Sequence, residues 1–371
     1  MHIGFDAKRF FFNHSGLGNY SRHTVELLVR HAPENTYTLF TPKPGGFPAP
    51  EGVEVCRPSA PASWFPSLWR SYGMHRDIRR QHIDIFHGLS NELPADIRRA
   101  HVKSVVTLHD LIFLQHPELY KPVDVKLYTA KYRRSCREAD CIIAVSRATA
   151  EALTAYWQIP EERIRVVYQG CHPQFLHPVG NTDKQQVREK YHLPERYLLS
   201  VGTMEQRKNL LLIVKALHAG DFGPLHLVAC GRPTPYLEQV RRYIGEHRLQ
   251  DRVHLIHNVA FQDLPAIYQM SEVFIYPSYI EGFGIPIVEA LSSHVPVITT
   301  RGGVFGETGG DACRYIDPDS PEELVQALQD ILSDSNLRQD MIARGNAHIR
   351  QFSEPVIVQN LTRVYREVAG I

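Results

Sequence analysis

The segment Val273–Leu291 constrains the fold of this chain more than any other stretch of the sequence. It reads VFIYPSYIEGFGIPIVEAL and begins with four apolar residues, which predict a buried strand of a parallel sheet. A loop with two glycines follows, and glycine allows a ligand to approach the backbone closely. Pro286 then occupies a position that suits the first turn of a helix. The segment therefore predicts a strand, a ligand-accessible loop and a helix in succession.

Two glutamates of this segment are candidate ligand contacts. Glu281 lies in the loop at the carboxyl end of the strand, and Glu289 lies about one turn into the helix. We expect both carboxylates to reach the same crevice, beside the free N–H groups at the start of the helix. A carboxylate among apolar neighbours needs a partner. The alternative is therefore a structural role for Glu289, either as the ion-pair partner of an arginine in its own domain or as a helix cap.

Short apolar or β-branched runs alternate with helical stretches along the first half of the chain. Strands are predicted at 2–6, 37–41, 53–56, 83–87, 104–109, 141–146 and 163–168, and helices at 18–30, 123–137 and 147–156. This alternation predicts a parallel, doubly wound α/β sheet, whose ligands bind beyond the carboxyl ends of the strands. The residues expected at those ends are Asp6, His87, His109, Asp110 and Ser146.

The second half repeats this alternation, with strands predicted at 197–201, 226–229, 253–257, 273–276 and 296–300. Ser320 and Glu323 form a capping box with Pro321 at the first helical position, which predicts a helix through Ile331. A length of 371 residues suggests two domains, each a doubly wound, Rossmann-like sheet. We place them at 1–175 and 190–352, joined by a polar link near 172–189. The last segment, 353–371, forms a terminal helix.

Composition excludes several classes of protein. No run of about 18 apolar residues and no signal-peptide pattern are present, so neither a transmembrane helix nor a secreted protein is expected. The six cysteines are scattered without a Cys-x-x-Cys pair, which is typical of reduced cytosolic thiols. Residues 1–180 carry 22 basic and 17 acidic residues, 22 − 17 = +5, and the remainder has 19 − 23 = −4. This asymmetry is too small for a nucleic-acid-binding protein, although it suits a first half that contacts an anionic surface or substrate.

The first half carries two candidate sites. Gly16 and Gly18 open a helix after the first strand, where helix N–H groups suit a phosphate, although a tight turn would equally explain both glycines. His109 and Asp110 end another strand at the predicted crevice. A lone histidine is more often structural than catalytic, but the neighbouring carboxylate and the position favour a functional role.

The first strand of the second half leads into a candidate anion site. Gly202 is followed by Arg207 and Lys208, just before a helix that Asn209 can cap. Two cations at a helix amino terminus predict an anion site, and two ordinary surface cations are the alternative. Charge-assisted hydrogen bonds contribute about 1.5–3 kcal/mol each. Loss of either cation is therefore expected to weaken the stabilisation of a transition state at this site by about ten- to two-hundred-fold.

No metal or cofactor is expected. Asp317-Pro318-Asp319 has a form that can chelate a metal, but it precedes a capped helix and therefore predicts a turn. The sequence contains no cluster of His, Cys and carboxylate residues with the spacing of a metal site.

Residues 67–81, SLWRSYGMHRDIRRQ, are basic with apolar residues interspersed. A basic amphipathic helix can lie on an acidic membrane surface. A helix that packs on the sheet and keeps one face solvated is more common, and this arrangement is favoured here.

The whole segment Val273–Leu291 resembles the donor-site signature of the group 1 glycosyltransferases, which are the retaining nucleotide-sugar glycosyltransferases of family four. Its Glu-x7-Glu spacing encloses Gly-Phe-Gly-x-Pro, and the glycine loop, the Leu-His-Asp turn, the Arg-Lys-Asn run and the closing helix extend the resemblance over nearly the whole chain. The resemblance implies the GT-B architecture, in which two Rossmann-like domains face each other across a cleft. The second domain would hold the nucleotide sugar, the first would hold the acceptor, and the terminal helix would pack back on the first.

The resemblance also implies roles for individual residues. Arg207 and Lys208 would neutralise the donor diphosphate, Glu289 would hold the ribose hydroxyls, and Glu281 would touch the donor sugar. His109 would contact the sugar and stabilise the reacting centre, and Asp110 would contact the acceptor. The implied catalytic residues are His109, Glu281, Arg207 and Lys208. The implied donor contacts are Gly16, Gly18, Arg207, Lys208, Glu281, Gly282, Phe283, Gly284 and Glu289.

The implied reaction moves a hexose from a nucleoside diphosphate to an acceptor hydroxyl with retention of configuration and without a metal. The expected partners are a nucleotide-sugar donor and a glycan or lipid-linked acceptor, with no nucleic acid. The protein is expected to be cytoplasmic, and a lipid-linked acceptor leaves open a peripheral contact with the inner membrane face. Bacterial surface polysaccharide or glycolipid assembly and mannosyl transfer are suggested by the resemblance alone.

The turns at 168–172 and 302–308 depart from the family pattern, which puts inherited roles for their polar groups in doubt. Two other functions stay open. A nucleotide-sugar epimerase shares this architecture and needs no acceptor. A non-catalytic subunit would bind the nucleotide sugar without transferring it.

Overall fold

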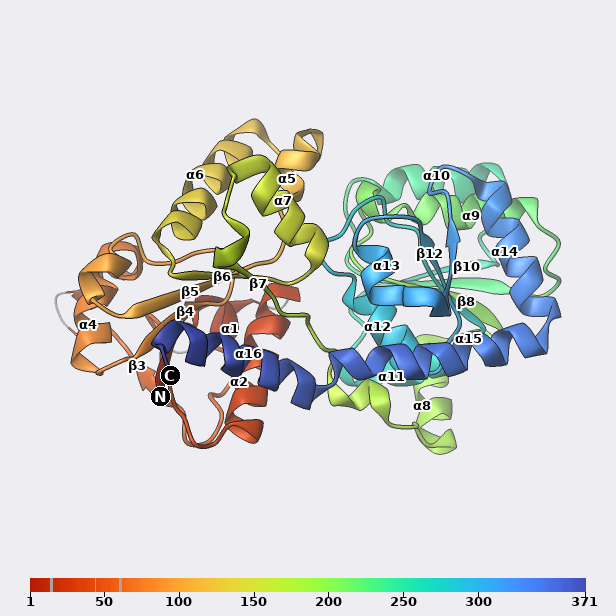
Figure 1. The fold of residues 1–371 in the computed structure, drawn as a ribbon. Helices are drawn as coiled ribbons and strands as arrows, with labels where there is room; N and C mark the ends of the chain where they lie inside the picture. Colours follow the sequence, from red (N-terminus) through yellow and green to blue (C-terminus); the bar gives the residue numbers. More distant parts are fainter. Residues whose placement is uncertain (14–15, 44, 60–61) are drawn as a thin grey trace. The chain divides into compact units, whose positions relative to one another are not determined.

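The computed structural model describes residues 1–13, 16–43, 45–59 and 62–371, and the chain divides into two compact units (Figure 1). Unit 1 comprises Met1–Gln169 together with Ser353–Ile371, and unit 2 comprises Gly170–Phe352. Each unit is built around one parallel sheet with helices on its faces. The predicted α/β, doubly wound fold is therefore confirmed in both halves of the chain.

The sheet of unit 1 has seven strands in the order β3-β2-β1-β4-β5-β6-β7, and all its pairings are parallel. The chain runs from β1 outward to β3 and then returns to β4 on the other side of β1. The topological switch point therefore lies between β1 and β4. The strands are β1 His2–Asp6, β2 Thr36–Phe40, β3 Glu54–Cys56, β4 Ile85–Gly88, β5 Lys103–Leu108, β6 Cys141–Ala144 and β7 Ile164–Val166.

Successive strand residues of unit 1 point into cores on opposite faces of the sheet. Val105 belongs to the core that α2 and α16 cover, whereas Val106 belongs to the core that includes Tyr132 of α6 and Leu153 of α7. The last helix, α16, packs beside α2 although the two are far apart in sequence (Figure 1). The helices are α1 Lys8–Phe12, α2 Gly16–His31, α3 Pro66–Leu68, α4 Met74–Arg80, α5 Ile112–Gln115, α6 Pro122–Glu138, α7 Arg147–Trp157 and α16 Glu354–Ala369.

The sheet of unit 2 has six parallel strands in the order β10-β9-β8-β11-β12-β13, so its switch point lies between β8 and β11. The strands are β8 Tyr197–Val201, β9 His226–Cys230, β10 Val253–Ile256, β11 Val273–Tyr276, β12 Val297–Thr300 and β13 Cys313–Ile316. The helices are α8 Asn181–Tyr191, α9 Leu210–Ala219, α10 Leu237–Glu246, α11 Leu264–Gln269, α12 Ile285–Ser292, α13 Val304–Gly309, α14 Pro321–Ser333 and α15 Ser335–His348.

Three local features differ from the sequence-based expectations. The expected polar link at 172–189 contains most of α8, which buries Val187 alone and so shows no apolar stripe in the sequence. Strand β13 was not predicted, because this edge strand buries only its first and last residues. The expected helix at 67–81 is divided into α3, the π-helical turn η2 (Trp69–Gly73) and α4.

Other local expectations hold. The Ser320 hydroxyl accepts a hydrogen bond from the Glu323 backbone N–H at 3.1 Å, so the predicted cap starts α14. Of the helices in the described ranges, none is long and apolar enough to cross a membrane.

Candidate active site

The switch point of the unit 2 sheet brings together the predicted cations and the first glutamate. Arg207 and Lys208 lie in the 3₁₀ turn η7 (Gln206–Lys208), which follows β8. Glu281 lies in the loop that follows β11, the neighbouring strand. The Tyr279 backbone N–H donates to the Arg207 carbonyl at 2.9 Å, so the two loops are joined directly.

Glu281 forms ion pairs with both cations. Its Oε2 lies 2.7 Å from Nη1 of Arg207, and its Oε1 lies 2.5 Å from Nζ of Lys208. The side chains of Glu281, Arg207 and Lys208 are only 9%, 19% and 16% exposed. Burial alone would raise the pKa of Glu281, but the two cations outweigh it and hold that pKa at about 2. The ionised carboxylate therefore occupies the anion site that the two cations create.

Two further residues fix the cations, and the sequence analysis assigned a role to neither. The Tyr276 hydroxyl accepts a hydrogen bond from Lys208 Nζ, which also lies 4.7 Å from the centre of the Tyr276 ring. Burial lowers the pKa of Lys208, and the Glu281 carboxylate opposes that shift. Arg207 Nη2 donates to Glu205 at 2.7 Å. The position of Tyr276 at the carboxyl end of a predicted strand is the sequence signal that could have identified it as a site residue.

Glu289, the second glutamate of the spacing, lies in α12 and is only 8% exposed. Its Oε2 accepts a hydrogen bond from the Tyr268 hydroxyl of α11 at 2.9 Å. Burial raises the pKa of Glu289 to about 7, and the Tyr268 hydrogen bond opposes this shift. Glu289 makes no ion pair within the described part of the chain and does not cap α12. Tyr268 is thus a second partner that the sequence pattern did not reveal.

The glycine loop between the two glutamates sets the start of α12. Gly284 has φ +98°, which is in the left-handed region that glycine adopts without strain. The Phe283 ring is buried and packs edge-on against Phe352, with 5.6 Å between ring centroids. A donor contact at Phe283 would therefore come from its backbone. Gly282 is partly exposed in the same loop.

His109 follows β5 at the carboxyl edge of the unit 1 sheet. Its Nε2 lies 2.9 Å from the Leu89 carbonyl oxygen, and its backbone N–H donates to Asn91 Oδ1 at 2.8 Å. Because a carbonyl oxygen can only accept, Nε2 carries the proton and Nδ1 keeps its lone pair. Asp110 is partly exposed, and its Oδ1 accepts a hydrogen bond from the Ile112 backbone N–H at 3.1 Å.

We expect His109 to stay neutral between pH 5 and pH 8. Burial lowers its pKa to about 4, so the imidazole contributes a hydrogen-bond acceptor and not a positive charge. The nitrogen chemical shifts of the imidazole, recorded on protein labelled with ¹⁵N-histidine, should stay constant over this range. A His109→Gln variant identifies the signal, and a midpoint near pH 6.5 would contradict the expectation.

His87 lies inside the sheet and not at a strand end, because β4 continues through Gly88. It is fully buried and hydrogen-bonds to the hydroxyls of Tyr365 and Thr107, both at 2.8 Å. Burial lowers its pKa to about 3. The sequence-based placement of His87 in the ligand crevice is therefore wrong, and the side chain joins α16 to the sheet.

Asp6 and Ser146 lie at strand ends as predicted, and both have structural partners. Asp6 Oδ2 pairs with Nη2 of Arg70 at 2.7 Å. Ser146 caps α7 by accepting a hydrogen bond from the Thr149 backbone N–H at 3.0 Å.

The predicted glycine loop leads into α2, which begins at Gly16. A Cβ atom at Gly18 would lie 1.9 Å from the Asn13 carbonyl oxygen, so no other residue fits without movement of the backbone. The space around Gly16 is open. His14 and Ser15, which belong to the predicted loop, lie outside the described residues.

The expected cap of α9 is not formed. Asn209 has φ +56°, and its side-chain amide donates to the Pro318 carbonyl at 2.7 Å. Asp317 and Asp319 form the predicted turn, in which the Asp319 backbone N–H donates to Asp317 Oδ1 at 2.8 Å. Among the residues that the structure describes, no group of three or more His, Cys, Asp and Glu side chains is placed to hold a metal ion.

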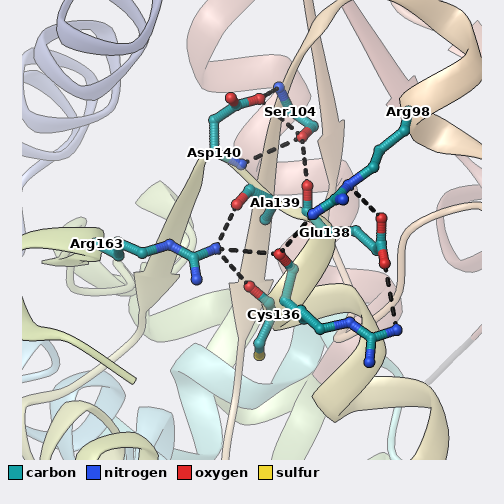
Figure 2. Close-up of polar contacts among 8 residues, drawn as sticks. Arg98, Ser104, Cys136, Glu138, Ala139, Asp140 and Arg163 are labelled. Carbon is teal, nitrogen blue, oxygen red and sulfur yellow. Dashed lines mark hydrogen bonds and ion pairs between the residues drawn. The ribbon is translucent and has the colours of Figure 1, made fainter. Parts of the chain in front are cut away.

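A cavity of about 600 Å³ lies where β5 and β6 begin, at the edge of the unit 1 sheet opposite His109. Arg163 donates to the carbonyls of Cys136 and Ala139 at 2.7 and 2.5 Å, and Ser104 donates to Asp140 at 3.0 Å (Figure 2). These contacts hold the carboxyl end of α6 against β5. The polar groups are engaged with one another, so we assign this cavity a structural role.

Comparison with known proteins identifies the family. The model of the glycosyl transferases group 1 matches residues 182–348, and the model of glycosyltransferase family 4 matches residues 15–175. The O-antigen chain mannosyltransferase B of Escherichia coli is 30% identical over 277 residues, which are 72% of this chain and 70% of that protein. This chain belongs to glycosyltransferase family 4. It is a group 1 glycosyltransferase, as the sequence signature predicted.

Solved structures extend this family fold to the whole chain. Sucrose-phosphate synthase (tll1590) from Thermosynechococcus elongatus aligns with a TM-score of 0.79 at 19% identity, covering 100% of this chain and 99% of that one. Anabaena Alr3699/HepE in complex with UDP and glucose aligns with a TM-score of 0.75 at 19% identity, covering 99% and 100%. These likenesses confirm the GT-B fold class of this glycosyltransferase.

Proposed function

We propose that this glycosyltransferase moves a hexosyl group from a nucleoside-diphosphate sugar to an acceptor hydroxyl, with retention of configuration and without a metal ion. The buried cluster of Arg207, Lys208 and Glu281 at the switch point of unit 2 carries the proposal. Fixed cations in a partly desolvated site stabilise charge that develops on a leaving group. Here that charge develops on the departing diphosphate.

Each side chain that would hold the donor has a partner within the protein. The diphosphate replaces the Glu281 carboxylate on Arg207 and Lys208, and Glu281 is then free to accept hydrogen bonds from the sugar hydroxyls. Glu289 accepts hydrogen bonds from the ribose hydroxyls. The pKa of Glu289 is about 7, and hydrogen bonds to the charged form of a carboxylate favour its ionisation. Donor binding near neutral pH should therefore release a proton.

The chemical step follows from these contacts. The bond between the anomeric carbon and the diphosphate oxygen breaks, and its electron pair leaves with the diphosphate. The acceptor hydroxyl forms the new bond on the same face of the sugar, and its proton passes to an oxygen of the leaving phosphate. His109 offers the lone pair of Nδ1 to a sugar hydroxyl, and Asp110 contacts the acceptor. No carboxylate nucleophile is needed in this scheme.

The relatives support a more specific proposal about substrates and location. The E. coli relative is an O-antigen chain mannosyltransferase, and the Anabaena structure contains UDP and glucose. From the E. coli relative we infer mannosyl transfer in the assembly of a bacterial surface polysaccharide or glycolipid. The acceptor is a glycan or a lipid-linked glycan, and the enzyme works in the cytoplasm or peripherally at the inner membrane face.

Calorimetric titration with UDP, GDP and ADP in the presence of EDTA tests the donor site. We expect one nucleotide to bind with a micromolar Kd, because its diphosphate meets Arg207 and Lys208 and its ribose meets Glu289. The Glu289→Ala variant should lose this binding, whereas Glu246→Gln, a change at an exposed glutamate of α10, should keep it. No nucleotide binding, or binding indifferent to Glu289, would show that this site is wrongly assigned.

Product analysis then separates the proposed reaction from its two rivals. Anomeric proton couplings of the isolated product report whether the configuration of the donor is retained, and the same assay in EDTA reports metal independence. Conversion of the nucleotide sugar without any acceptor would indicate an epimerase. Tight nucleotide binding without transfer to any member of a broad acceptor set would indicate a binding subunit.

A further inference from the structure

Unit 1 exposes four large apolar side chains within the short segment 64–72. Trp64, Phe65, Leu68 and Tyr72 are 73%, 61%, 58% and 58% exposed. They belong to η1 (Ala62–Trp64), α3, η2 and the residue between η1 and α3. We call these four residues the aromatic stripe. Single exposed apolar residues are common, whereas a concentration of this kind marks an interaction surface.

The backbone of the aromatic stripe is fixed to the rest of unit 1 on its other side. Trp69 is 2% exposed, and its indole N–H donates to Asp77 Oδ2 at 2.7 Å. Arg70 pairs with Asp6 at 2.7 Å and with Glu92 at 3.3 Å. The stripe therefore faces solvent from an anchored helical segment, and its exposure does not result from poor packing of that segment.

Positive charge surrounds the aromatic stripe. Arg76, Arg79 and Arg80 of α4 are exposed, and Arg57 is exposed just before the stripe. Residues 57–82 contain five arginines and one acidic residue, 5 − 1 = +4. That acidic residue, Asp77, is buried and pairs with Arg80 at 2.7 Å. Arg70 is also paired, with Asp6 and Glu92, so Arg57, Arg76 and Arg79 supply the exposed excess of positive charge beside the apolar side chains.

We propose that the aromatic stripe and the arginines of α4 dock unit 1 on a membrane surface that contains anionic lipid. Trp and Tyr place an apolar ring among the acyl chains and a polar edge at the headgroups. Arginines near such a surface are attracted by anionic headgroups, by about fivefold in partitioning for each residue. The positive charge favours an anionic lipid surface over a second copy of the chain, because two copies would bring like charges together at this surface.

This inference deepens the proposed peripheral location at a membrane face, and it does not rest on the proposed reaction. The residues that carry it belong to unit 1, whereas the Arg207–Lys208–Glu281 cluster belongs to unit 2. Docking would bring the enzyme to acceptors that are held in or near the membrane.

Trp64 provides a direct reporter of docking. The chain has three tryptophans, and Trp69 and Trp157 are only 2% and 6% exposed, whereas Trp64 is 73% exposed. We expect the tryptophan emission of the full-length protein to shift to shorter wavelength on addition of vesicles of phosphatidylglycerol and phosphatidylethanolamine. Vesicles of phosphatidylcholine alone should leave it unchanged. Doxyl-labelled lipid should quench the shifted emission, and added salt should weaken binding.

Co-sedimentation with the same anionic vesicles tests the residues. Trp64→Ser with Phe65→Ser should lower partitioning at least about tenfold, because two rings no longer enter the interface. Arg76→Gln with Arg79→Gln should lower it about 25-fold. Tyr156→Ser is the matched control, because Tyr156 is 45% exposed on α7 of the same unit, and its partitioning should not change. Unaltered thermal unfolding shows that each variant is folded.

Two results would overturn the proposal. One is equal partitioning of the wild type and the stripe variant, including the case in which neither binds anionic vesicles. The other is a dimer, measured by light scattering, that the stripe variant converts to a monomer while lipid binding is absent. In that case a second copy of the chain covers the aromatic stripe.

Discussion

Replacing Glu281 with glutamine is expected to lower the free energy of unfolding by about 3 kcal/mol at pH 7, because removal of one partner leaves buried charges uncompensated. Arg207 keeps its contact with Glu205, but Lys208 keeps only the Tyr276 hydroxyl. The pKa of Glu281 is lowered to about 2 from 4.5, so its stabilisation is present above about pH 4.5 and is lost as the pH falls through 2. Urea unfolding should show that the variant and the wild type differ less in free energy of unfolding at low pH than at pH 7.

The same substitution should tighten the binding of a nucleoside diphosphate while it slows sugar transfer. The diphosphate no longer competes with a carboxylate for Arg207 and Lys208, yet the donor sugar loses a contact. The variant should therefore gain more thermal stability from the nucleotide than the wild type gains. Glu205→Gln is the matched control, since the Glu205 side chain is 36% exposed and pairs with Arg207 but not with Lys208. Weaker nucleotide binding by Glu281→Gln would mean that the carboxylate does not occupy the diphosphate site.

Glu289→Gln should have the opposite effect on stability, with a gain of about 3 kcal/mol at pH 8. The pKa of Glu289 is about 7 in the folded protein and 4.5 in the unfolded reference, a difference of 7 − 4.5 = 2.5. Each pKa unit corresponds to about 1.4 kcal/mol. Because the unfolded chain loses its proton first, Glu289 makes the wild type less stable as the pH rises from about 4.5 to 7. Glutamine removes this penalty and still accepts the Tyr268 hydrogen bond.

Unfolding of the Glu289→Gln variant and the wild type across pH 4.5 to 8 measures this effect. The two stabilities should coincide near pH 4.5 and diverge as the pH rises. Glu246→Gln should track the wild type throughout, because this glutamate is exposed on α10. The more stable Glu289 variant should also fail to bind nucleotide, which would make it a case of stability gained at the expense of function. Parallel pH profiles for the variant and the wild type would refute a raised pKa.

The sequence predicted central strands that are buried along most of their length. Val273–Tyr276 and Tyr197–Val201 match their predicted bounds, because central strands of a covered parallel sheet must be apolar on both faces. It did not predict α8, whose single buried residue leaves no periodic signal, or β13, whose edge position allows exposed residues. His87 was misplaced because its covering partner, Tyr365, comes from the far end of the chain.

The candidate site could be predicted only in part for a similar reason. Arg207, Lys208 and Glu281 follow neighbouring strands at a switch point, so topology alone brings them together. The roles of Tyr276 and Tyr268 depend on side-chain direction and on the packing of α11 against α12, which no local pattern encodes. Asn209 adopts a left-handed backbone conformation and binds the Pro318 carbonyl, although its position before a helix predicted a cap.

The return of α16 to unit 1 sets the order in which this protein can mature on the ribosome. Unit 2 is one continuous stretch, Gly170–Phe352, and it is complete before the last 19 residues, 353–371, are added. Unit 1 starts the chain, but its core includes Ile357, Leu361 and Tyr365 of α16. During synthesis the first half must therefore wait, with an apolar surface uncovered, until residues 353–371 have been added. The half made first is the half that finishes folding last, and the nascent chain needs protection by chaperones most in this interval.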